Sequence, residues 1–154
     1  MRSAMRDWLL VVVAGGFLLV GYLAQRLDWL EPASQAVVVE SSCDLRQQAC
    51  DLDLHGQHLQ FIVEPRNFQA LTPLTLTLHA PSPSVTAASV EFEGLNMDMG
   101  YNRVLLQAGA DGHFNATAML PACTLERMQW LIHLRVDNGR EITDYRFRID
   151  TWRG

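Results

Sequence analysis

Hydrophobic residues follow two different patterns along the chain. An apolar run from Trp8 to Ala24 contains no charged residue, and with its flanks it approaches the roughly 20 residues that cross the hydrocarbon core of a bilayer. After residue 36, apolar residues recur at every second position, which is typical of strands with one buried face. The sequence therefore predicts one N-terminal transmembrane helix followed by a β domain.

The charges beside the apolar run predict its orientation. Arg2 and Arg6 precede the run, and positive residues favour the cytoplasmic side. We expect a single-pass protein of a bacterial inner membrane with a cytoplasmic N-terminus. Residues 1–30 would form the cytoplasmic start and the anchor, 31–35 a linker, and 36–154 a periplasmic domain. The alternative is a cleaved signal peptide, but the run exceeds the roughly 7–15 apolar residues of such a peptide. Either alternative places the domain outside the cytoplasm.

The alternating runs predict about seven or eight short strands separated by turns. His55-Gly56-Gln57-His58 indicates a hairpin or tight turn, Pro81-Ser82-Pro83-Ser84 a break, and Asn138-Gly139 a type I′ hairpin turn. Only residues 125–130 compete as a helical turn. This spacing favours a mainly β fold, an antiparallel immunoglobulin-like sandwich. The strands are expected within residues 36–39, 52–63, 74–79, 85–95, 102–107, 113–120, 128–136 and 142–149.

The net charge and the motifs of the chain argue against several classes of function. The net charge of -5 argues against a nucleic-acid partner. No nucleophile-elbow, phosphate-loop or zinc-protease motif is present, so we expect no enzyme activity. The three cysteines, Cys43, Cys50 and Cys123, suggest one disulfide and one remaining thiol in an exported domain. Cys43 and Cys50 would close a short loop, and pairing of either with Cys123 stays open.

Two methionines flank an aspartate between glycines, in Gly94-Leu95-Asn96-Met97-Asp98-Met99-Gly100. Thioether sulfur is a soft, neutral ligand that suits Cu(I). Cys123 would add a thiolate and His113, as a weaker candidate, an imidazole. The sequence therefore predicts a copper site of Met97, Met99, Cys123 and His113. The alternative is that both methionines fill the core at a strand end.

A resemblance to known periplasmic domains rests on four parts of the chain. They are Gly94–Gly100, Gly112-His113-Phe114, Leu120-Pro121-Ala122-Cys123 and Trp130. They resemble the small periplasmic β domains of the FixH-like and YtkA-like type over roughly residues 73–150, together with the anchor. The resemblance implies a sandwich fold and a role in copper handling or in assembly of haem-copper oxidases. Relatives with a His-rich copper motif carry histidines near the methionine pair, and here none is adjacent to Met97 or Met99.

Two functions are therefore expected. One is a Cu(I)-binding protein or assembly factor for a copper-dependent membrane complex such as a respiratory oxidase. The other is a non-metal module that docks a membrane partner through an exposed edge or loop.

Overall fold

The computed structural model describes residue 16 and residues 36–80, 85–109 and 112–153. Apart from Gly16, the predicted anchor and linker lie outside the described residues, as does the predicted break at 81–84. Within the part of the chain that is described, no helix is long and apolar enough to cross a membrane. The residues from Ala36 onward form one compact unit.

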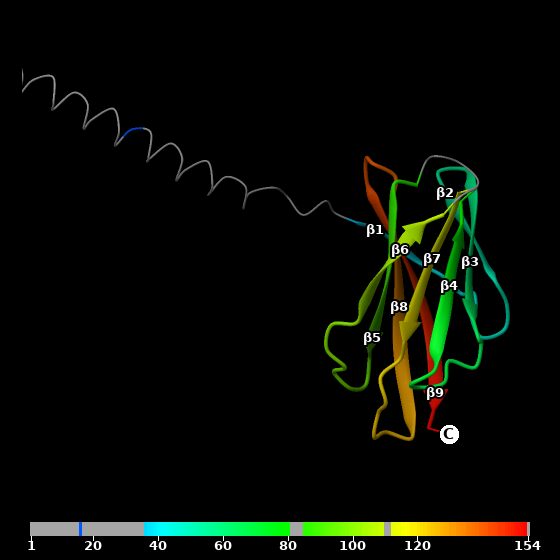
Figure 1. Cartoon of the computed structure of the whole chain (residues 1–154), viewed down its shortest axis with the longest axis vertical. Helices are drawn as coiled ribbons and strands as arrows, with labels where there is room; N and C mark the ends of the chain where they lie inside the picture. The colour runs from blue at the N-terminus through cyan, green and yellow to red at the C-terminus, as the bar shows by residue number, and fades with distance from the viewer. Residues whose placement is uncertain (1–15, 17–35, 81–84, 110–111, 154) are drawn as a thin grey trace, which may run out of the picture. The chain divides into compact units, whose positions relative to one another are not determined.

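Nine strands make up this unit, and no helix occurs in its described residues, which confirms a mainly β fold (Figure 1). They are β1 (Val37–Glu40), β2 (Cys50–Leu54), β3 (Gln57–Glu64), β4 (Pro73–His79), β5 (Ala87–Gly94), β6 (Arg103–Ala108), β7 (His113–Met119), β8 (Arg127–Asp137) and β9 (Ile142–Trp152). The predicted strand positions agree with these bounds to within a few residues, because alternation of buried and exposed side chains runs through most of them.

The strands form one curled sheet in the order β1-β9-β8-β5-β6-β7-β4-β3-β2. Its two halves face each other, because Phe61 of β3 contacts Phe147 of β9 with ring centroids 5.8 Å apart. Near the same edges, the hydroxyl of Tyr145 on β9 donates to the carbonyl oxygen of Asp53 on β2 at 2.6 Å. The core therefore lies between the two halves.

The core is centred on β8 and β9. Trp130, Ile132 and Leu134 of β8 are buried on the inner face, as predicted. Tyr145 and Phe147 of β9 are buried opposite them in the same core. Burial of such large apolar side chains is the dominant favourable contribution to folding.

One strand pairing differs from the expected antiparallel arrangement. β1 pairs with β9 in parallel, from Val37 opposite Thr143 to Glu40 opposite Arg146. The other described strand pairs are antiparallel. All four residues of β1 are exposed, so its side chains show no alternation from which a direction could be predicted.

The hairpin predicted as one alternative at His55-Gly56 is present, whereas the Asn138-Gly139 turn differs from its prediction. His55 and Gly56 both have positive φ, 53° and 81°, in a two-residue loop between β2 and β3, which is the type I′ pattern. At Asn138-Gly139 only Gly139 has positive φ, 80°, and the loop is longer, so the type I′ prediction there is wrong. The Asn138 side-chain oxygen accepts hydrogen bonds from the amides of Arg140 and Glu141, each at 2.9 Å, which stabilises the wider loop.

The cysteine pairing left open by the sequence is resolved. Cys43 and Cys50 form a disulfide with their Cα atoms 5.9 Å apart, and Cys123 is free and half-buried. Cys50 is fully buried, so the disulfide fastens the loop between β1 and β2 to the core.

Candidate functional site at the sulfur-rich end of the sheet

The loop that carries the methionine pair is held against β8 by one side chain. The Asn96 amide group donates to the carbonyl oxygen of Arg127 at 2.9 Å and accepts from the backbone amide of Gln129 at 3.0 Å. The adjacent amide of Leu95 donates to the carbonyl oxygen of Gln129 at 2.8 Å. These bonds place Met97 beside the start of β8.

Gly94, the last residue of β5, has no side chain, so Met97, Met99 and Met128 can pack close to its backbone. A Cβ added there would lie 2.3 Å from the carbonyl oxygen of Met97, 2.5 Å from Cε of Met128 and 3.0 Å from Cγ of Met99. Real Cβ atoms do not approach other atoms so closely, so any side chain at this position would displace its neighbours. Met128 was not among the predicted site residues. Its place two positions before Trp130, on the same face of β8, was a signal for core packing alone.

Cys123 meets the methionine pair from another part of the chain. Its Sγ lies 3.2 Å from Sδ of Met97, although the residues are 26 positions apart. The backbone amide of Leu125 lies 3.4 Å from the same sulfur. Zinc–sulfur bonds are about 2.3 Å long, and bonds from sulfur to copper are similar. One copper ion can therefore contact the sulfurs of both Cys123 and Met97. The structure thus brings together Met97 and Cys123, with Met99 packed on the same glycine.

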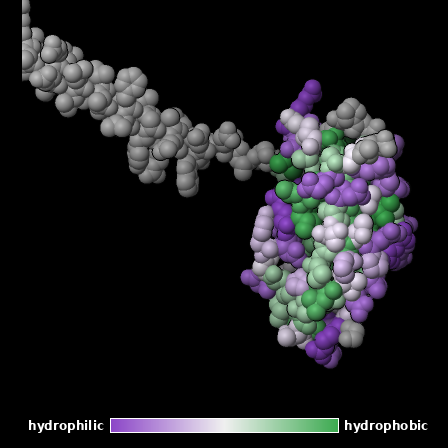
Figure 2. All heavy atoms as spheres, in the orientation of Figure 1, coloured by the Kyte–Doolittle hydropathy of each residue, from purple (hydrophilic) through white to green (hydrophobic). Residues whose placement is uncertain are grey.

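The sulfurs are neither sealed inside the core nor fully exposed. Met97, Met99 and Cys123 are half-buried and pack against the core. Cys123 lines a cavity of about 190 Å³ whose other walls include Trp130. Met99 lines a separate hollow with Tyr101, among others. Figure 2 shows hydrophobic residues along the visible face of the domain, some of them toward the sulfur-rich end and interspersed with hydrophilic ones. This accessible, mostly apolar rim leaves a route to the sulfurs.

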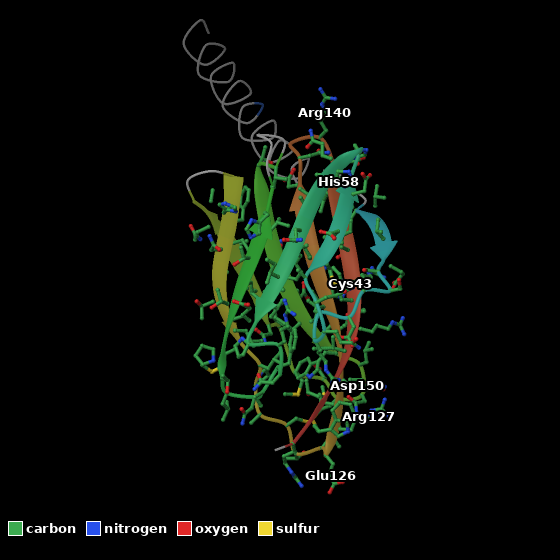
Figure 3. The ribbon with its side chains drawn as sticks, turned by 90° about the vertical axis from the view of Figure 1, so that its right-hand side faces the viewer. Cys43, His58, Glu126, Arg127, Arg140 and Asp150 are labelled. Carbon is green, nitrogen blue, oxygen red and sulfur yellow. A yellow bond between two sulfur atoms is a disulfide. The ribbon has the colours of Figure 1, made fainter. Side chains whose placement is uncertain are left out.

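His113 does not join this group. It is the first residue of β7, whereas Met119, beside the sulfur-rich end, is the last. The two residues are six positions apart along the strand, about 20 Å at 3.3 Å per residue. Figure 3 shows His58, which lines the same hollow as His113, toward one end of the domain and Glu126, in the loop after Cys123, at the other. His113 pairs instead with His79 on β4. Burial, and then the charge of neighbouring His113, lowers the pKa of His79.

Oxygen, nitrogen and thiolate ligands alone do not form a metal site in the described residues. No group of three or more His, Cys, Asp or Glu side chains there is arranged to hold an ion. A metal at the sulfur-rich end would therefore depend on methionine sulfur in addition to Cys123. That ligand set fits Cu(I) and disfavours hard ions such as Mg²⁺ or Ca²⁺.

Comparison of the chain with protein-family models and with curated proteins found no match.

Proposed function

We propose that this protein is a membrane-anchored periplasmic accessory protein that binds Cu(I) and assists the assembly of a copper-dependent, haem-copper oxidase-like membrane complex. The observation that supports it most is the 3.2 Å approach of the Cys123 and Met97 sulfurs. Met97, Met99 and Cys123 are the proposed ligands, and His113 is left out because it lies at the other end of β7.

The chemistry of these ligands suits a protein that receives copper and passes it on. Thioethers are soft and neutral, so they hold Cu(I) without the charge that would trap it. The Cys123 thiol would lose its proton on binding, which makes the affinity dependent on pH. The half-buried position of all three residues leaves the ion accessible to a partner.

The location is proposed from the sequence. The disulfide Cys43–Cys50 fits an oxidising compartment, and the apolar run from Trp8 to Ala24 would anchor the domain in the inner membrane. The curled sheet of nine strands fits an immunoglobulin-like sandwich. The resemblance of residues 94–100 and 120–123 to FixH-like and YtkA-like domains supports an oxidase as the client.

A competition titration tests the copper site. The untagged full-length chain is titrated with Cu(I) against a chelator, without oxygen and with a reductant. We expect the Met97→Leu and Cys123→Ser variants to bind at least about tenfold more weakly than wild type, about 1.4 kcal/mol per tenfold. Met5→Leu, a methionine at the N-terminus, is the matched control and should leave the affinity unchanged. Equal affinity in wild type and in a Met97→Leu/Cys123→Ser variant would exclude the site.

The exposed apolar residues beside Met99 favour a second function, a non-metal module that docks a membrane partner. Tyr101 is 77% exposed, Leu71 64% and Met119 47%, and all three line the hollow next to Met99. Flexible methionines adapt well to such contacts. In this case a Met97→Leu/Met99→Leu variant would lose its co-purifying membrane partner, while wild type and variant would both contain no copper.

A further inference from the structure

Two histidines meet at the end of the β4–β7 pair, remote from the sulfurs. His79 and His113 are direct partners in the antiparallel register. Their ring centroids are 4.3 Å apart and the rings are inclined by 82°. Directly opposite residues are the closest side-chain neighbours in a sheet, so the two imidazoles can approach one ion together.

One nitrogen of this pair lacks a partner. Nδ1 of His113 is buried and has no hydrogen bond. Buried polar atoms are nearly always paired, and an exception calls for a ligand or water that completes it. A neutral imidazole also carries one unprotonated nitrogen whose lone pair can bind a metal.

The surroundings of the pair are open to solvent and include several polar side chains. His79 and His113 line a hollow of about 300 Å³ together with Asp51, His58 and Gln60 of the neighbouring strands. The Gln60 amide donates to the Asp51 carboxylate at 2.9 Å, so this negative charge is fixed in place beside the hollow. Figure 3 shows His58 at the end of the domain opposite Glu126 and Arg127. A hydrated cation can enter from solvent and would be attracted by the carboxylate.

The backbone around the pair is also fixed. The Ala80 amide donates to the Gly112 carbonyl oxygen at 2.9 Å, and the Gly109 amide donates to the His113 carbonyl oxygen at 2.7 Å. These bonds hold the last residue of β4 and the first of β7 in register. Little backbone ordering would therefore be needed when an ion binds.

We propose that His79 and His113 form a second metal site, for a divalent ion of the Cu²⁺ or Zn²⁺ class, separate from the sulfur-rich end. Imidazole nitrogen suits these ions, whereas thioether sulfur suits Cu(I). With two protein ligands, water completes the coordination, which agrees with the lack of any group of three His, Cys, Asp or Glu ligands among the described residues. This site does not depend on the proposed copper function.

Electron paramagnetic resonance with Cu²⁺ as the probe tests the site. The experiment uses the untagged full-length chain carrying Cys123→Ser, because a free thiol reduces Cu²⁺. We expect splitting from two imidazole nitrogens, and at least about tenfold weaker binding after His79→Gln or His113→Gln. His55→Gln, at the β2–β3 turn and outside the hollow, is the matched control and should keep the affinity. An unchanged affinity in the His79→Gln/His113→Gln variant would overturn the proposal.

A measurement on the unaltered chain guards against variants that fail to fold. Zn²⁺ is added while the imidazole resonances are followed by NMR. We expect those of His79 and His113 to shift first, while those of His133, which is hydrogen-bonded to Asp144 and Glu93, stay in place. Equal shifts of all histidines, or none, would contradict the site. Neither result bears on the sulfur ligands, so the two proposals fail independently.

Discussion

The side chain of Tyr145 is nearly inaccessible to solvent, and its hydroxyl reaches across the core to the carbonyl oxygen of Asp53. Burial, and then the charge of Asp53, raises the pKa of Tyr145 to about 12. The folded protein therefore keeps this phenol protonated at a pH where the unfolded chain, with a pKa of 10.0, begins to ionise. The contribution to stability is complete below pH 10.0 and is lost as the pH rises towards 12.

Ultraviolet titration of tyrosine ionisation tests this expectation. A transition near pH 12 should be present in wild type and absent in Tyr145→Phe. That variant should also lower the free energy of unfolding by about 1 kcal/mol, because one hydrogen bond is lost. Titration curves of wild type and Tyr145→Phe that coincide near pH 12 would show that the phenol is not held in this environment.

Gly94 is the residue on which the arrangement of sulfurs depends most. A methyl group there would push the Met97 backbone and the Met99 and Met128 side chains outward. We expect Gly94→Ala to cost about 1–3 kcal/mol of stability through overpacking and to weaken Cu(I) binding. The control is Gly56→Ala, which meets no atom within 4 Å but is strained at φ 81°. Denaturant unfolding and Cu(I) competition should show that only Gly94→Ala changes the affinity.

At the scale of elements, the loop between β1 and β2 is closed by the disulfide Cys43–Cys50, seven positions apart. Closing a loop of this length lowers the entropy of the unfolded chain, which stabilises the folded state by about 2.5 kcal/mol at 25 °C. A Cys43→Ala/Cys50→Ala variant should lose at least that much, because Cys50 is also part of the core. Unfolding curves with and without a reductant measure it, and reduction should leave the curve of the variant unchanged. A wild-type curve unaffected by reduction would contradict the pairing.

The strands could be predicted because burial of one face imposes alternation. Trp130, Ile132 and Leu134 follow this rule, and their predicted shared face is the buried one. The Asn138-Gly139 turn could not be predicted from its dipeptide alone, since its conformation depends on side-chain hydrogen bonds of Asn138. Type I′ geometry occurs instead at His55-Gly56, where the sequence predicted a hairpin or tight turn.

The parallel pairing of β1 and the grouping of the sulfurs could not be predicted from the sequence, for a different reason. Val37 and its neighbours in β1 are exposed, so pairing with β9 depends on backbone bonds that side chains do not specify. The approach of Cys123 to Met97 joins residues from two loops and follows only from the sheet order. His113 was assigned to the same site because sequence separation does not reveal the end of a strand at which a residue lies.

On the scale of the whole molecule, different metal-ligating types of side chain lie at the two ends of the domain. Soft sulfurs lie where the β5–β6 and β7–β8 loops meet, and imidazoles lie where β4 ends and β7 begins.

The proposed location makes a prediction about Cys123, the free cysteine of the domain. A maleimide that does not cross membranes should label Cys123 in intact spheroplasts, because the domain would face the periplasm. Cys123→Ser provides the unlabelled control. Labelling that appears only after the membrane is permeabilised would place the domain on the cytoplasmic side and contradict the proposed orientation.

X-ray absorption at the copper edge, on the Cu(I)-loaded full-length chain, tests the sulfur site most directly. The account predicts a shell of sulfur scatterers at about 2.3 Å, similar to zinc–thiolate distances, that loses intensity in Met97→Leu and again in Met97→Leu/Cys123→Ser. A first shell of nitrogen and oxygen alone, identical in wild type and variants, would contradict it.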